Sequence, residues 1–163
     1  MKAFKLLFTI LILSATHSYA QLDVTKILSD NKDYFITRTI NYPITGTYLF
    51  EGKTEPIVEL NGNGTGVFQF EDLTKKKIEW GIQCDNVGVP TAKKGFDSAS
   101  YTLWYKSKNG EKTGEDYWIP VHFSIHFKIH KMFVFGDRSK TYEDPIEKED
   151  KEDKEDKADK AKE

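Results

Sequence analysis

The sequence predicts an all-β domain built as a meander of antiparallel strands. Apolar and polar residues alternate with a period of two over long stretches of the middle of the chain, as in strands with one buried face. The pairs Asn61-Gly62 and Asn109-Gly110 separate such stretches, and Asn-Gly favours the tight turns that join antiparallel strands. Hairpins that follow one another without an intervening helix must close into a barrel or pack as a sandwich.

The first twenty residues have the layout of a secretory signal peptide. Lys2 and Lys5 precede an apolar run over residues 6–13, and Ser18-Tyr19-Ala20 places small residues at the −3 and −1 positions of a cleavage site. The apolar run is much shorter than the roughly 20 residues that a membrane-spanning helix needs. We therefore expect cleavage after Ala20, a secreted or periplasmic mature protein, and no stable membrane span.

A short helix and then a hairpin are the first elements that we expect in the mature chain. The helix would start at Leu22 or Asp23 and end at Leu28. Further along, residues 56–60 and 66–70 flank the first Asn-Gly turn and are expected to pair as antiparallel strands.

Two alternating stretches follow, separated by a segment without a clear period. Residues 78–84 and 101–106 carry apolar side chains at every second position, which predicts two strands. Residues 85–98 between them are interpreted as mobile surface, with a binding loop as the alternative. Cys84, the only cysteine of the chain, lies in the apolar phase, which indicates a partly buried thiol rather than a nucleophile.

The longest alternation extends from Tyr117 to Ile129. A single strand over this stretch would measure about 43 Å at about 3.3 Å per residue, which is too long for a small domain. We expect the strand to break at Pro120 or to turn near residues 128–131 into a further strand at 132–135.

Three histidines lie in the polar phase of this stretch, namely His122, His126 and His130. A spacing of four brings imidazoles together on a helix, whereas residues four apart on a strand are about 13 Å apart. A shared metal ion needs bonds of roughly 2 Å to each ligand. We therefore expect a solvated polar face and no metal site, with a site completed by neighbouring strands as the alternative.

Charge is concentrated at the end of the chain. Residues 143–163 contain eleven acidic residues and six lysines in degenerate Lys-Glu-Asp repeats. No apolar stripe is available for docking, so we expect a disordered tail, with weak capture of cations or of a basic partner as the alternative. Residues 21–142 hold sixteen basic and fifteen acidic residues. They form one domain of suitable size, without the basic field that a nucleic-acid partner requires.

Three short motifs resemble the lipocalin-like (calycin-type) β-barrels. Gly46-Thr47-Tyr48 resembles the Gly-x-Trp at the start of that family's first strand, and Asp116-Tyr117 resembles the end of its Thr-Asp-Tyr element. Residues 133–138 are similar to its last strand, which ends in an arginine. The resemblance implies an antiparallel meander barrel of about eight strands with an open, apolar-lined mouth. It also implies a structural floor formed by Gly46, Tyr48 and Arg138, in which the arginine packs on the tyrosine ring.

The favoured function is that of a non-enzymatic binding protein without a cofactor, because the sequence contains no recognisable catalytic motif. A small lipophilic ligand in the barrel lumen would contact inward apolar residues. These residues are Phe68, Phe70, Trp80 and Leu103. The first alternative is a filled barrel that binds an envelope protein through its surface, with Trp104 and Trp118 as exposed anchors. The second is a metal-binding protein that uses the histidine face.

Overall fold

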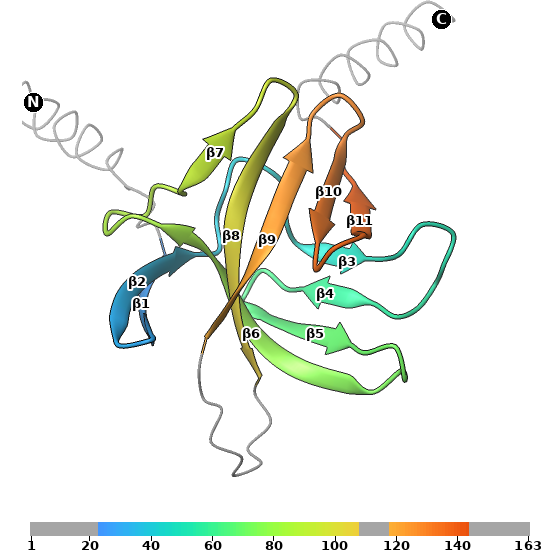
Figure 1. The fold of residues 1–163 in the computed structure, drawn as a ribbon, viewed down its shortest axis with the longest axis horizontal. Helices are drawn as coiled ribbons and strands as arrows, with labels where there is room; N and C mark the ends of the chain where they lie inside the picture. Colours follow the sequence, from blue (N-terminus) through green and yellow to red (C-terminus); the bar gives the residue numbers. More distant parts are fainter. Residues whose placement is uncertain (1–22, 108–117, 144–163) are drawn as a thin grey trace, which may run out of the picture.

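A computed structural model describes residues 23–107 and 118–143 of the protein. These residues form an antiparallel β-barrel (Figure 1). The described strands are β1 (Val24–Ser29), β2 (Lys32–Thr37), β3 (Gly46–Tyr48), β4 (Val58–Leu60), β5 (Thr65–Gln69), β6 (Lys75–Cys84), β7 (Ala92–Lys94), β8 (Ser98–Ser107), β9 (Ile119–His126), β10 (Lys131–Val134) and β11 (Arg138–Thr141). The predicted all-β class is confirmed.

Eight of the described strands form the barrel wall. Their order is β3-β4-β5-β6-β8-β9-β10-β11, and every pairing is antiparallel. Leu49 and Ser139 exchange two backbone hydrogen bonds of 3.0 and 2.7 Å, which bring β3 and β11 together. The meander is therefore nearly closed, and the predicted barrel of about eight strands is confirmed.

The prediction of a short helix before the barrel is wrong for the described residues. Val24–Ser29 forms β1, which pairs with β2 along its whole length. Asp30 and Asn31 make the turn at φ values of 49° and 58°, as a two-residue turn with two left-handed residues requires. The Ser29 hydroxyl donates a hydrogen bond of 3.1 Å to the Trp118 carbonyl, which ties this N-terminal hairpin to the barrel.

The N-terminal hairpin covers the outer face of the barrel at Trp104. This side chain is only 4% exposed, and its ring centroid lies 4.6 Å from that of Tyr34. Ile36 packs in the same cluster, and a Cβ added to Gly81 would lie 2.8 Å from its Cδ1. The glycine in β6 thus leaves room for β2. The expectation that Trp104 is an exposed anchor is wrong, while Trp118 is partly buried against the same cluster.

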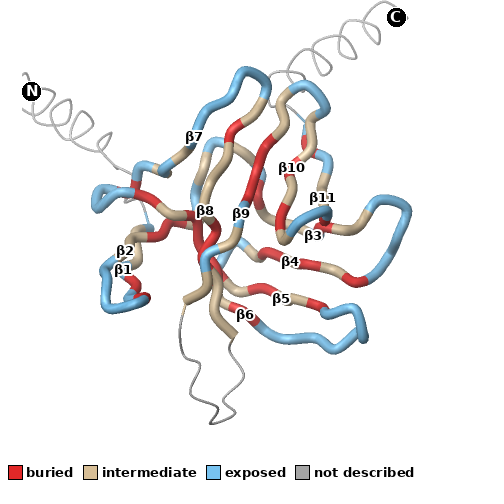
Figure 2. The backbone as a smooth tube through the Cα atoms, in the orientation of Figure 1, coloured by how far each residue is buried: buried red, intermediate tan, exposed pale blue. Residues whose placement is uncertain are grey.

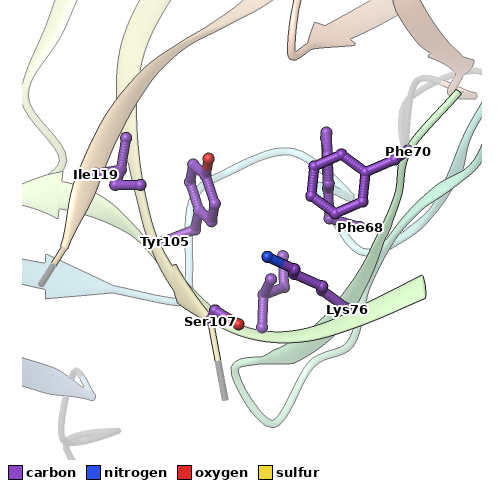
Figure 3. Close-up of a pocket in the computed structure, with 7 residues that line it drawn as sticks. Phe68, Phe70, Lys76, Tyr105, Ser107 and Ile119 are labelled. Carbon is purple, nitrogen blue, oxygen red and sulfur yellow. The ribbon is translucent and has the colours of Figure 1, made fainter. Parts of the chain in front are cut away.

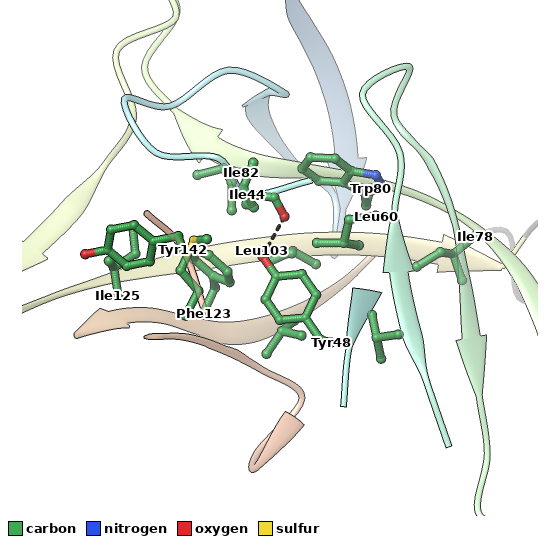
Figure 4. Packing of buried hydrophobic residues seen from close by; sticks show 13 residues of the cluster. Ile44, Tyr48, Leu60, Ile78, Trp80, Ile82, Leu103, Phe123, Ile125 and Tyr142 are labelled. Carbon is green, nitrogen blue, oxygen red and sulfur yellow. Dashed lines mark hydrogen bonds between the residues drawn. The ribbon is translucent and has the colours of Figure 1, made fainter. Parts of the chain in front are cut away.

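The barrel interior is filled by side chains from opposite walls (Figure 4). The buried apolar cluster comprises Ile44, Tyr48, Val58, Leu60, Ile78, Trp80, Ile82, Leu103, Phe123, Ile125, Met132, Val134 and Tyr142. Figure 2 shows buried residues along the barrel strands and exposed residues at most of the turns. Barrels of about eight strands are just wide enough to be filled in this way. The middle of this barrel is therefore a packed core.

Several strand and turn predictions are confirmed in the described residues. The turn at 61–64 joins β4 to β5, and β9 ends at His126 before a turn that leads into β10. The segment 85–98 contains the short strand β7, which pairs with β8, so it is not wholly an irregular loop. A sheet partner can order a segment that has no apolar period of its own.

Other predictions lie outside the described residues. They concern the signal peptide over residues 1–20, the turn at Asn109-Gly110, the Asp116-Tyr117 motif, and the tail from residue 144 onward. Within the described ranges, no helix has the length and hydrophobicity that a membrane crossing demands.

Candidate functional site

A pocket opens at one end of the barrel, where β5 and β8 end and β6 and β9 begin (Figure 3). The residues that line this mouth pocket are Phe68, Phe70, Lys76, Ile78, Tyr105, Ser107 and Ile119. Its volume is about 190 Å³. An apolar cavity of about 150 Å³ admits benzene, so the mouth pocket is large enough for a small aromatic ring system.

Aromatic side chains form much of the pocket wall. The ring centroids of Phe68 and Phe70 are 4.8 Å apart in an edge arrangement. Phe135 contacts both Phe68 and Tyr105, each at a centroid distance of 4.8 Å. Tilted and edge-on ring pairs of this kind are favourable beyond their buried area. The wall is therefore held in place by contacts that do not require a ligand.

Lys76 is the cation of the mouth pocket. It lies opposite Phe68 in the β5–β6 register, in the same phase as the buried residues Ile78 and Trp80. Its ammonium group lies 5.2 Å from the Phe70 ring centroid. Figure 3 shows the ammonium directed into the space between Tyr105 and the phenylalanine rings. A position that alternation assigns to the barrel interior thus carries a charge at the open end.

Arg138 in β11 lies beside this wall and is buried. Its guanidinium carbon is 4.6 Å from the Phe50 centroid and 5.0 Å from the Phe68 centroid. One of its nitrogens donates a hydrogen bond of 3.3 Å to the Gln69 carbonyl. Burial lowers the pKa of Arg138, and the nearby Glu71 opposes this shift. The family resemblance implies that this arginine packs on the Tyr48 ring, whereas the rings next to its guanidinium are those of Phe50 and Phe68.

Tyr48 and Gly46 support the chain that leads into β3. The Tyr48 hydroxyl donates a hydrogen bond of 2.5 Å to the Ile44 carbonyl (Figure 4). Gly46 has a φ of 123°, and a Cβ there would lie 2.9 Å from the Lys140 ammonium. That ammonium donates a hydrogen bond of 2.9 Å to the Pro43 carbonyl. Both residues therefore have contacts that suit a structural role.

Burial of Tyr48 predicts a loss of stability at alkaline pH. Burial raises the pKa of this phenol above its ordinary value. Its contribution to stability is therefore complete below about pH 10 and is lost as the pH rises further. The free energy of unfolding should fall above about pH 10 by up to ~1.4 kcal/mol per pH unit for this group. Urea titrations of the wild type and Tyr48→Phe at several pH values measure the slope, and equal slopes would contradict this assignment.

The lumen residues predicted from the sequence divide into two sets. Phe68 and Phe70 line the mouth pocket. Trp80 and Leu103 are fully buried in the core. The sequence analysis did not identify Lys76 as a pocket residue. The available signal was its spacing, because Lys76 lies an even number of positions before the buried residues Ile78 and Trp80 of β6.

The three histidines occupy different surroundings. His122 is exposed, whereas His126 lies at the end of β9 and its ring centroid is 5.0 Å from that of Phe133. His130 lies in the following turn and stacks on Tyr142 at a centroid distance of 5.6 Å. Within residues 23–107 and 118–143, no group of three or more His, Cys, Asp or Glu side chains could hold a metal ion.

Cys84 is a free and buried cysteine at the end of β6. Burial raises the pKa of its thiol, and the charge of Asp85 raises it further. A raised pKa leaves little thiolate near neutral pH. The prediction that the Cys84 thiol is at least partly buried is confirmed.

Comparison with protein-family models, curated proteins and solved structures found no match to this chain. The fold and the pocket define the class of protein by themselves. It is a nearly closed antiparallel barrel of eight strands with a packed core and a pocket at one end.

Proposed function

We propose that this chain is a non-enzymatic, lipocalin-like binding protein that acts outside the cytoplasm and holds one small apolar or amphipathic ligand. The mouth pocket carries this proposal. Its lining is mainly aromatic and aliphatic, with a few polar groups at the edge, which is typical of small-molecule sites. The signal-peptide pattern at the start of the sequence supports the location.

The packed core determines where the ligand binds and how large it is. Trp80 and Leu103 fill the barrel below the pocket, so the ligand stays at the open end instead of entering the centre. A volume of about 190 Å³ suits one or two fused rings. Ring contacts with Phe68 and Tyr105 would each contribute about 0.5–1.5 kcal/mol beyond burial.

Filling the pocket with a side chain tests this function. Ile119 lines the pocket, and Ile119→Trp would place an indole in the space that the ligand needs. Calorimetric titration with the neutral probe 2-naphthylmethanol should show binding to the wild type and about tenfold or weaker binding to this variant. The matched control is Ile129→Trp at an exposed turn residue, which should bind as the wild type does. Equal affinities for all three proteins, or no binding to the wild type, would contradict the proposal.

A surface interaction is the second candidate function, because two neighbouring turns expose apolar side chains. Phe96 is 99% exposed and Ile129 is also exposed. The Phe127 amide donates a hydrogen bond of 2.9 Å to the Asp97 carbonyl, which holds the two turns together. Exposed apolar groups that are held in one place are typical of docking sites for another protein. A co-purifying envelope protein that sediments with this chain would favour this function over ligand binding.

A further inference from the structure

We propose that the ligand of the mouth pocket is an aromatic anion, a small ring system with one carboxylate, and that Lys76 binds the carboxylate. This inference rests on the proposed function and specifies its ligand. Lys76 lies opposite Phe68 and in phase with Ile78, and it lines the pocket at the open end of the barrel, where it is exposed. A charged residue at such a position, beside an apolar pocket, indicates a binding role.

The Lys76 ammonium has no carboxylate partner among the described residues, whereas some other lysines there do. Lys26 pairs with Asp33 at 2.7 Å, and Lys106 pairs with Glu79 at 3.3 Å. The Lys76 ammonium lies over the Phe70 ring and forms no ion pair within the described residues. The described lining of the pocket contains no acidic side chain. A carboxylate on the ligand would complement the charge of Lys76.

Other charged groups lie near the pocket, among them Arg138 and Glu71. Arg138 is buried against the Phe50 and Phe68 rings, and its Nε has no hydrogen-bond partner among the described residues. Lys75, Lys76 and Lys77 at the start of β6 are all exposed. Lys76 is the one charged side chain among the described lining residues, and a cleft lined by one sign of charge attracts ligands of the opposite sign. These cations would disfavour a cationic ligand, which aromatic walls alone would attract.

The pocket therefore orients an aromatic anion in one way. Phe68 and Tyr105 stack on each other with ring centroids 6.4 Å apart, so the ligand ring would lie along the edges of these two rings and reach Ile78 and Ile119. Its carboxylate would point outward to Lys76, where a charge-assisted hydrogen bond forms close to solvent. Such bonds are stronger than neutral ones, so the carboxylate gives selectivity that the rings alone do not.

A matched pair of probes tests this chemistry on the full mature chain. 2-Naphthoate and 2-naphthylmethanol share a ring system and differ in charge. At low ionic strength, calorimetry should show that the wild type binds the naphthoate about tenfold more tightly than the alcohol. Lys76→Met keeps most of the side-chain length and should bind both probes about equally. Lys76→Gln should do the same if the methionine variant folds poorly, and added salt should reduce the preference of the wild type.

Lys77→Met is the control, because it removes the same charge from the neighbouring residue, which lies opposite Val67 on the other face of the strand. This variant should keep the preference for naphthoate. Equal binding of both probes to the wild type would overturn the inference and leave the proposed function intact. Binding of neither probe would overturn both. Equal loss of preference in Lys76→Met and Lys77→Met would overturn the assignment to Lys76.

Discussion

Replacement of Trp80 by alanine should remove about 3–5 kcal/mol from the free energy of unfolding, the usual cost of truncating a large buried aromatic side chain. Trp80 is fully buried in β6. Its indole N–H donates hydrogen bonds of 3.2 Å to the Asn61 carbonyl and 2.9 Å to the Thr65 carbonyl. The side chain thus fills the core and ties β6 to the turn between β4 and β5. Urea denaturation followed by far-ultraviolet circular dichroism measures the loss.

Two further substitutions test whether the loss arises from the position of Trp80 in the core and from its hydrogen bonds. Trp80→Phe keeps a ring in the core but leaves the two carbonyl groups without this donor, so it should cost less than the alanine variant and still more than about 1 kcal/mol. Trp118→Ala removes a partly buried indole next to the N-terminal hairpin and should cost less than about 3 kcal/mol. A loss for Trp80→Ala no larger than that for Trp118→Ala would contradict a filled core centred on Trp80.

Replacement of Gly66 by alanine should also destabilise the barrel, by about 1–3 kcal/mol or more. Gly66 lies opposite Leu60 in the β4–β5 pair. A Cβ at this position would lie only 2.3 Å from the Glu59 carbonyl oxygen. Because that oxygen belongs to the backbone of the adjacent strand, the clash is relieved only by moving β4 away from β5. Thermal and urea unfolding of the variant measure the effect.

Gly62 in the preceding turn provides the matched control. A Cβ at Gly62 would meet its nearest neighbour, the Thr45 methyl group, at 3.9 Å, which is an ordinary contact. Gly62→Ala should therefore leave the free energy of unfolding within about 0.5 kcal/mol of the wild type. Similar losses in both variants would show that the close approach of β4 to β5 does not determine the effect.

The barrel strands could be predicted where alternation is long. Residues of β6 and β8 alternate because one face of each strand meets the core, and the turn at 61–64 has the glycines and asparagines that its backbone requires. The N-terminal hairpin could not be predicted in this way. Its turn uses Asp30 and Asn31 instead of an Asn-Gly pair, and its position depends on a tertiary contact between Ile36 and Gly81.

The candidate site was predictable only in part. Phe68 in β5 and Phe70 just after it share one phase of the alternation, and both line the pocket. Lys76 belongs to the run Lys75-Lys76-Lys77, which as sequence indicates a solvated charged segment. Alternation places it in phase with Ile78, but its position at the open end of the barrel becomes visible only when the β5–β6 register is known. Trp104 could not be predicted as buried either. It lies on the outer face of β8, and the N-terminal hairpin, which is distant in the sequence, covers it.

Nuclear Overhauser contacts between bound 2-naphthoate and the methyl groups of the protein test ligand binding at the mouth pocket most directly. We predict contacts from the probe to Ile78 and Ile119, which line the pocket, and none to Leu103 or Ile125 in the core. Contacts to Leu103 or Ile125 would contradict the packed core and show that the ligand enters the lumen. Saturating probe without a contact to any of these four residues would contradict the pocket itself.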